Sequence, residues 1–110
     1  RLAWIDQMIE MFEAEGIDMS VWYTVQGSIR IRKDSHCSLR ACIENAANPE
    51  CKPSVVKVSE SNDTYTYEVE WTNSQENECA VNEIRLFVDI LKTMDSSVKI
   101  DLDCNIRWIT

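Results

Sequence analysis

The spacing of apolar residues alternates along the chain between the period of a helix and the period of a strand. Near the start, five apolar residues recur at helical spacing: Leu2, Ile5, Met8, Ile9 and Phe12. Gly16 follows them at the place where a helix-ending residue with positive φ is expected. The pattern therefore predicts a helix over residues 2–16.

From Val21 the period changes to two, which is typical of a strand. One face carries Val21, Tyr23, Val25, Ile29 and Ile31, and the other carries Trp22, Thr24, Gln26, Ser28, Arg30 and Arg32. A hairpin turn at Gln26-Gly27 would move Ile29 and Ile31 away from the first three apolar residues. A single strand over residues 20–33, with a bend or bulge at Gly27, keeps all five together and is favoured over a hairpin.

A short helix and a hairpin are predicted next. Asp34 and Ser35 are the expected caps of the helix, whose apolar side carries Leu39, Cys42, Ile43 and Ala46. Asn48-Pro49 ends it. Residues 56–59 and 65–71 both alternate between apolar and polar side chains, and the turn-forming segment 61–63 separates them, which indicates two strands of a hairpin.

The last two elements have the strongest patterns. Helical spacing from residue 80 to 94 places five apolar residues on one side: Ala80, Ile84, Phe87, Leu91 and Met94. From Val98 to Trp108 every even-numbered residue is apolar or cysteine, and every odd-numbered one is polar. We therefore expect a helix and then a strand over residues 98–109, with the even-numbered side chains in the core.

The element order α-β-α-β-β-α-β predicts an α+β fold in a single domain of residues 1–110. Without the N-terminal helix, the order β-α-β-β-α-β is that of a ferredoxin-like sandwich with a mainly antiparallel sheet. We expect its two longest strands, 20–33 and 98–109, side by side in the middle of the sheet. Both helices of the repeat should then cover one face.

Acidic residues dominate the charge. The net charge is −8, and seven acids lie between Lys57 and Arg85 with no base among them. Nucleic acids and anionic lipids bind largely through Lys and Arg, so we expect neither as a partner. A smaller basic patch consists of Arg30, Arg32, Lys33 and Arg40. No apolar run approaches the ~20 residues that cross a bilayer, so a soluble protein is expected.

The five cysteines are irregularly spaced and include no C-x-x-C pair: Cys37, Cys42, Cys51, Cys79 and Cys104. This spacing favours buried free thiols in a reducing compartment, hence a cytoplasmic protein. The alternative is a secreted protein with a disulfide between Cys37 and Cys51.

Candidate chemistry is sparse. The sequence lacks the Gly-rich phosphate-binding motifs, so no cofactor is expected. His36 beside Cys37 is the only cysteine–histidine pair, and a hydrolase built on it is the weakest hypothesis because no third group orients the imidazole. Asp101 and Asp103 lie two residues apart on one predicted strand, and Glu68 and Glu70 do so on another, so the carboxylates of each pair emerge on one face. Because no loop with calcium-ligand spacing surrounds them, they indicate a solvated acidic face rather than a metal site. Trp22 lies among polar residues, which fits either an interface anchor or a side chain that packs under the N-terminal helix.

These features favour a non-enzymatic, acidic protein-binding module of the immunity-protein, inhibitor or chaperone type, which docks on a basic protein partner. The alternative is a ferredoxin-like regulatory or ligand-binding domain that acts as a homodimer through its open sheet face. The predicted partner-binding residues are Trp22, Glu68, Glu70, Glu76, Glu78, Asp101 and Asp103.

Overall fold

The computed structural model describes residues 3–7, 10, 21–46, 51–73 and 81–108, and within these it has an α+β fold. Its elements are β1 (Val21–Arg32), α2 (Leu39–Glu44), β2 (Ser54–Glu60), β3 (Thr64–Asn73), α3 (Val81–Met94) and β4 (Lys99–Trp108). Residues 3–7 are also helical. The described elements thus follow the predicted order.

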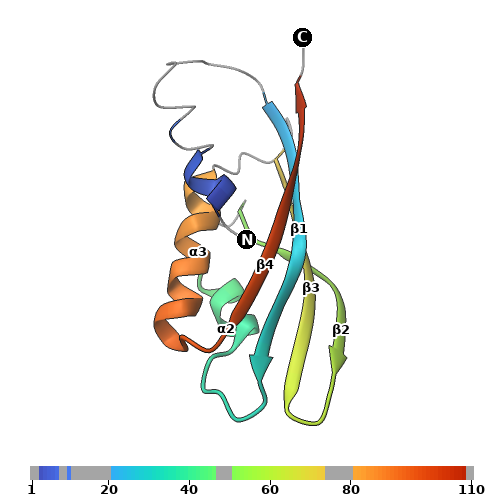
Figure 1. Ribbon diagram of the computed structural model, residues 1–110, viewed down its shortest axis with the longest axis vertical. Coiled ribbons are helices and arrows are strands. Elements are labelled where there is room, and N and C mark those ends of the chain that lie inside the picture. Colours follow the sequence, from blue (N-terminus) through green and yellow to red (C-terminus); the bar gives the residue numbers. More distant parts are fainter. Residues whose placement is uncertain (1–2, 8–9, 11–20, 47–50, 74–80, 109–110) are drawn as a thin grey trace.

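The four strands form one antiparallel sheet in the order β2-β3-β1-β4. Helices α2 and α3 lie together on one side of it (Figure 1). Strands β1 and β4 do pair, as expected, but the expectation that both lie in the middle of the sheet was wrong, because β4 is an edge strand. The tight turn of the β2–β3 hairpin places β2 beside β3, so the two inner positions belong to β3 and β1.

Strand β1 passes through Gly27 without a break, and its pairing with both neighbours is in continuous register. The single-strand interpretation is therefore confirmed. Glycine is needed because the backbone of β4 comes very close: a Cβ at this position would collide with the carbonyl oxygen of Asp101 and lie 2.8 Å from the Leu102 Cα.

The core lies between the helices and the sheet, and the predicted alternation is confirmed for β1 and around Leu102 of β4, whereas the predicted apolar side of β2 is exposed at Val56 and Val58. In β1 the buried residues are Tyr23, Val25, Ile29 and Ile31; in α3 they are Val81, Ile84, Phe87, Val88 and Leu91. On β4, Leu102 is buried, and its odd-numbered neighbours are exposed. Trp71 of β3 meets Phe87 edge to face at 5.6 Å between ring centroids, which joins the two layers.

The N-terminal helical residues also belong to this core. Ile5 is fully buried, and the Trp4 indole donates to the Leu102 carbonyl oxygen at 2.7 Å. Asp6 forms an ion pair with Arg85 of α3. Most of the predicted helix 2–16 lies outside the described residues.

The cap of α2 differs from the prediction. Ser38, not Asp34 or Ser35, caps this helix, and its hydroxyl accepts from the Ala41 amide at 3.2 Å. Helix α2 begins only at Leu39, so the hydroxyl of Ser35 is left to accept from the Cys37 amide and to bond to Asp95. Through that second bond the β1–α2 loop is attached to the end of α3.

The cysteines follow neither expected pattern fully. Cys37, Cys42 and Cys104 carry free thiols, whereas Cys51 is disulfide-bonded. The alternative pairing of Cys37 with Cys51 is therefore wrong. Cys79, the fifth cysteine, lies outside the described residues.

In the part of the chain that the structure describes, no helix has the length and apolar character needed to cross a membrane.

Candidate functional site

The side of the sheet that faces away from α2 and α3 carries the polar phase of each strand. We call it the open face, and it includes Thr24, Gln26, Ser28, Arg30, Arg32, Lys57, Thr66, Glu68, Glu70, Thr72, Lys99, Asp101, Asp103 and Asn105. The strictly alternating strands produce it, because successive side chains point to opposite faces of a sheet.

Four predicted site residues converge on this face, and we call them the acidic quartet: Glu68, Glu70, Asp101 and Asp103. The register places Ser28 of β1 between Glu68 and Asp101. Gln26, two residues before Ser28 on β1, lies between Glu70 and Asp103 in the same register. Two pairs of carboxylates, distant in sequence, therefore flank the middle of β1.

Contacts around the quartet hold part of it in place. The Gln26 side chain donates to Glu70 at 3.3 Å, and the Thr72 hydroxyl donates to the same carboxylate at 3.4 Å. All four carboxylates line a shallow depression of about 420 Å³, to which Gly27 also contributes. Gly27 lies between Gln26 and Ser28 in the phase of β1 that faces the core, so it lines the depression with its backbone.

The spacing of the quartet suits a broad docking surface better than a chelate. Neighbouring strands lie ~4.8 Å apart, so the carboxylates of β3 and β4 are separated by about twice that distance. Among the described residues, no group of three or more His, Cys, Asp or Glu side chains is placed to hold a metal ion. What the quartet offers is a concentrated negative potential over several residues.

The other end of the open face is basic, and sequence reasoning did not connect Lys99 of β4 with the two arginines of β1 there. Arg30 and Lys99 pair across β1 and β4, and Arg32 lies two residues further along β1. These three, the basic end, line a second depression of about 760 Å³ with Thr66. Arg32 also pairs with Asp34 at 3.0 Å. Alternation placed these cations on polar faces, but only the strand register brings them together.

The rest of the predicted basic patch is dispersed. Lys33 pairs with Glu60 at 2.9 Å and lies over the Tyr65 ring, and Arg40 belongs to α2. The basic end therefore shares only its two β1 arginines with the patch that sequence proximity indicated.

Three predicted site residues cannot be placed on this surface. The backbone of Trp22 pairs with Arg107, but the Trp22 side chain lies outside the described part. Glu76 and Glu78 lie in the segment 74–80, which is also outside it.

The His36–Cys37 pair does not have the features of an activated nucleophile. His36 is exposed, whereas Cys37 is buried. Burial is the main cause that raises the pKa of the Cys37 thiol, and the neighbouring Cys42 raises this pKa further. A catalytic cysteine needs the opposite shift, which favours the thiolate.

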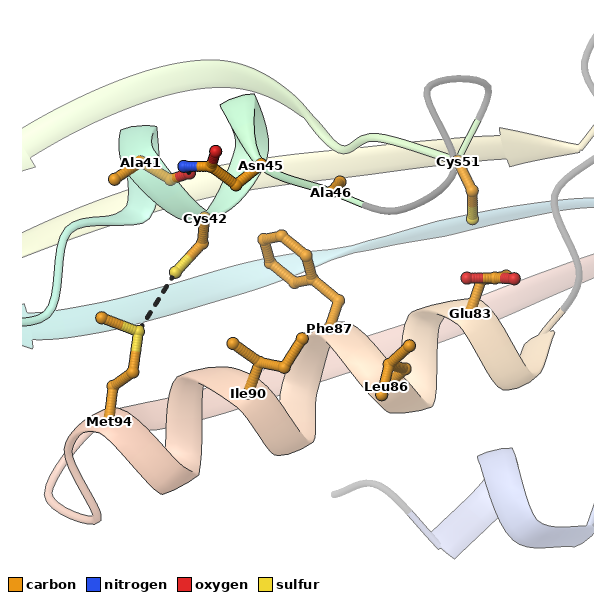
Figure 2. A pocket seen from close by; sticks show the side chains of 10 residues that line it. All are labelled: Ala41, Cys42, Asn45, Ala46, Cys51, Glu83, Leu86, Phe87, Ile90 and Met94. Carbon is orange, nitrogen blue, oxygen red and sulfur yellow. Dashed lines mark hydrogen bonds between the residues drawn. The ribbon is translucent and has the colours of Figure 1, made fainter.

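A groove of about 260 Å³ runs between α2 and α3 on the helical side of the molecule (Figure 2). Its lining is mainly apolar and includes Cys42, Phe87, Ile90 and Met94. Figure 2 shows Cys42 and Met94 pointing toward each other at one end, where the two sulfur atoms are 3.5 Å apart.

No protein-family model, no curated protein and no solved structure matches the chain.

Proposed function

We propose that the protein is a non-enzymatic binding module that docks the acidic quartet of its open face on a basic protein surface. One observation carries this proposal: the strand register brings Glu68 and Glu70 together with Asp101 and Asp103 across β1. Like charges so arranged repel one another in the free protein, and a basic partner relieves part of that repulsion.

The arrangement fits an inhibitor, immunity protein or chaperone, since these classes act by covering a surface of another protein. Negative potential accelerates the encounter with a basic partner and opposes contact with nucleic acids or anionic membranes. Trp22, Glu76 and Glu78 stay predicted members of this surface.

The test is charge reversal in the variant Glu68→Lys/Glu70→Lys. Affinity capture first identifies the partner, and association kinetics with that purified partner are then measured at several salt concentrations. We expect the association rate to fall at least about tenfold at low salt and little at high salt, because electrostatic steering is screened by ions.

The matched control is Glu10→Lys/Glu44→Lys, which changes the net charge equally at exposed helical positions away from the open face. It should slow association much less. Recovery of no basic partner would refute the proposal, as would a control variant that slows association as much as the reversed quartet.

The basic end favours a second candidate, a homodimer formed by two open faces. Turned by a two-fold rotation, the acidic quartet of one copy would meet Arg30, Arg32 and Lys99 of the other, so the face is self-complementary. Sedimentation velocity would show a dimer that Arg30→Glu/Lys99→Glu disrupts. Mixing that variant with Asp101→Lys/Asp103→Lys should restore it.

We also propose that the fold is ferredoxin-like. β1 and β2 run parallel with β3 between them, and β3 and β4 run parallel with β1 between them. Two interleaved crossovers of this kind support the split βαβ arrangement. Cross-strand nuclear Overhauser contacts between β1 and β4 would test it.

For the compartment, the disulfide at Cys51 supports an oxidising environment. We therefore propose a secreted protein in place of the expected cytoplasmic one. Tracing the tagged protein in its native cells would test this directly.

A further inference from the structure

Three sulfur side chains come together beneath the groove between α2 and α3, on the opposite side of the sheet from the acidic quartet. The Cys42 thiol donates to the Met94 thioether across 3.5 Å, and it also interacts with the thiol of Cys37. Cys42 therefore links the other two residues. The three residues come from the β1–α2 loop, from α2 and from the last residue of α3.

We propose that Cys37, Cys42 and Met94 form a binding site for a soft monovalent metal ion, Cu(I). Two thiolates and one thioether supply a donor set of the kind that selects Cu(I) over harder cations. Structural zinc, by contrast, takes four N, O or S ligands in tetrahedral geometry.

The spacing between the sulfur atoms of Cys42 and Met94 is close to what such a site needs. Metal–sulfur bonds of about 2.3 Å place trigonal ligands about 4.0 Å apart. The observed 3.5 Å between Cys42 and Met94 requires only a small separation of the two side chains. The unbranched Met94 side chain, with three rotatable bonds, can supply that movement.

The site is both shielded and reachable. Cys37 is buried, whereas Cys42 and Met94 are half-buried and line the groove of about 260 Å³ (Figure 2). The ion therefore has an entry path from solvent, and Phe87 and Ile90 surround that path with apolar side chains. On binding, Cu(I) replaces the two thiol protons, which leave to solvent, and each sulfur forms one bond to the metal.

The experiment is an anaerobic titration of the purified protein with Cu(I), with bicinchoninate as the competing chelator. We expect one ion per chain and sulfur-to-metal charge-transfer absorption. X-ray absorption at the copper edge should show three sulfur neighbours in the wild type and two in Met94→Leu. Circular dichroism shows whether each variant is folded.

Cys42→Ser should weaken Cu(I) binding by more than about 100-fold. The loss of a residue that only supports a metal ligand already lowers metal affinity about 10- to 100-fold, and the loss of a ligand should lower it more. The matched control is Cys104→Ser, which removes another half-buried free thiol, on β4. It should leave affinity and stoichiometry unchanged.

Several results would overturn the proposal. One is unchanged affinity in folded Cys42→Ser, and another is equal loss in Cys104→Ser. A third is a stable disulfide between Cys37 and Cys42 in the isolated protein, with no uptake of Cu(I). A fourth is an unchanged sulfur count in Met94→Leu.

Discussion

Gly27 lies where the backbones of β1 and β4 approach most closely. The atoms that a Cβ would meet there belong to the backbone of Asp101 and Leu102, so no side chain can rotate away to make room. Gly27 belongs to the core-facing phase of β1, with the buried Val25 and Ile29 two residues away on either side, and its absent side chain allows the two strands to pair. The pairing of β1 with β4, and with it the stability of the sheet, therefore depends on this absent side chain.

We expect Gly27→Ala to destabilise the protein by about 1–3 kcal/mol, the usual range for overpacking. Urea denaturation would measure the loss as a lower midpoint. The control is Ser28→Ala at the next position of β1, which should change stability by less than about 0.5 kcal/mol. Equal stability of the two variants would show that β4 does not approach β1 so closely.

Asp95 attaches the end of α3 to the β1–α2 loop. Hydrogen bonds lower the pKa of Asp95 to about 2, and the bond from Ser35 contributes more than either bond from Ser97. A lowered pKa means that the folded state favours the carboxylate. The stabilisation is therefore fully present above pH ~4, the ordinary value of aspartate, and is lost as the pH falls toward 2.

In Ser35→Ala/Ser97→Ala the pKa of Asp95 should rise toward its ordinary value, which an NMR titration of the side-chain carboxyl would follow. Thermal unfolding of wild type should lose more stability between pH 4 and pH 2 than unfolding of Asp95→Asn, which has no carboxylate to protonate. Identical acid sensitivity of these two proteins would contradict the assignment.

Among the elements, β2 is the least covered. All seven of its residues are exposed, including Val55, Val56 and Val58, because it forms the outer edge of the sheet (Figure 1). The register shift between Val55 and Lys57 interrupts the regular pairing of β2 with β3. An irregular edge with a lysine opposes pairing with other chains.

Cys51 precedes β2 by three residues, so its disulfide holds the chain where this exposed strand begins.

A strong reductant should therefore lower the melting temperature, contrary to what buried free thiols alone would predict. Loss of a native disulfide from a small domain costs about 2–5 kcal/mol. Cys51→Ser should show the lower melting temperature without reductant and respond little when reductant is added. Cys104→Ser should keep the full response of wild type. If reductant leaves the wild-type melting temperature unchanged, Cys51 does not stabilise the fold through a disulfide.

At the scale of the whole molecule, the sheet separates two surfaces of different character. The open face is charged, with the acidic quartet and the basic end side by side, whereas the helical side holds the apolar groove and the three sulfur atoms. The core lies between the groove and the quartet, so no side chain belongs to both.

We therefore expect the two surfaces to act independently. Cys42→Ser should leave association with a basic partner unchanged, and Glu68→Lys/Glu70→Lys should leave Cu(I) affinity unchanged. In the combined variant the two losses should add, as is usual for sites without shared contacts. Kinetic and metal titrations of all three variants would check this, and any non-additive loss would reveal coupling through the sheet.

The sequence by itself determined the elements and their faces. An apolar period of 3.6 or 2 residues is a local property, which can be recognised within about ten residues. On β1 it correctly assigned Val25 and Ile29 to the core face and Gln26 and Ser28 to the polar face. For the same reason it placed the acidic residues of β3 and β4 on the polar face, where all but the half-buried Glu70 are exposed.

Only the tertiary structure decided which strands and helices lie next to one another. The acidic quartet exists because β3 and β4 pair on opposite sides of β1 in one register. Likewise, Cys42 contacts Met94 only because α2 packs against α3. Such pairings depend on loop closure and core packing over tens of residues, and local periodicity carries no information about partners so distant in the chain.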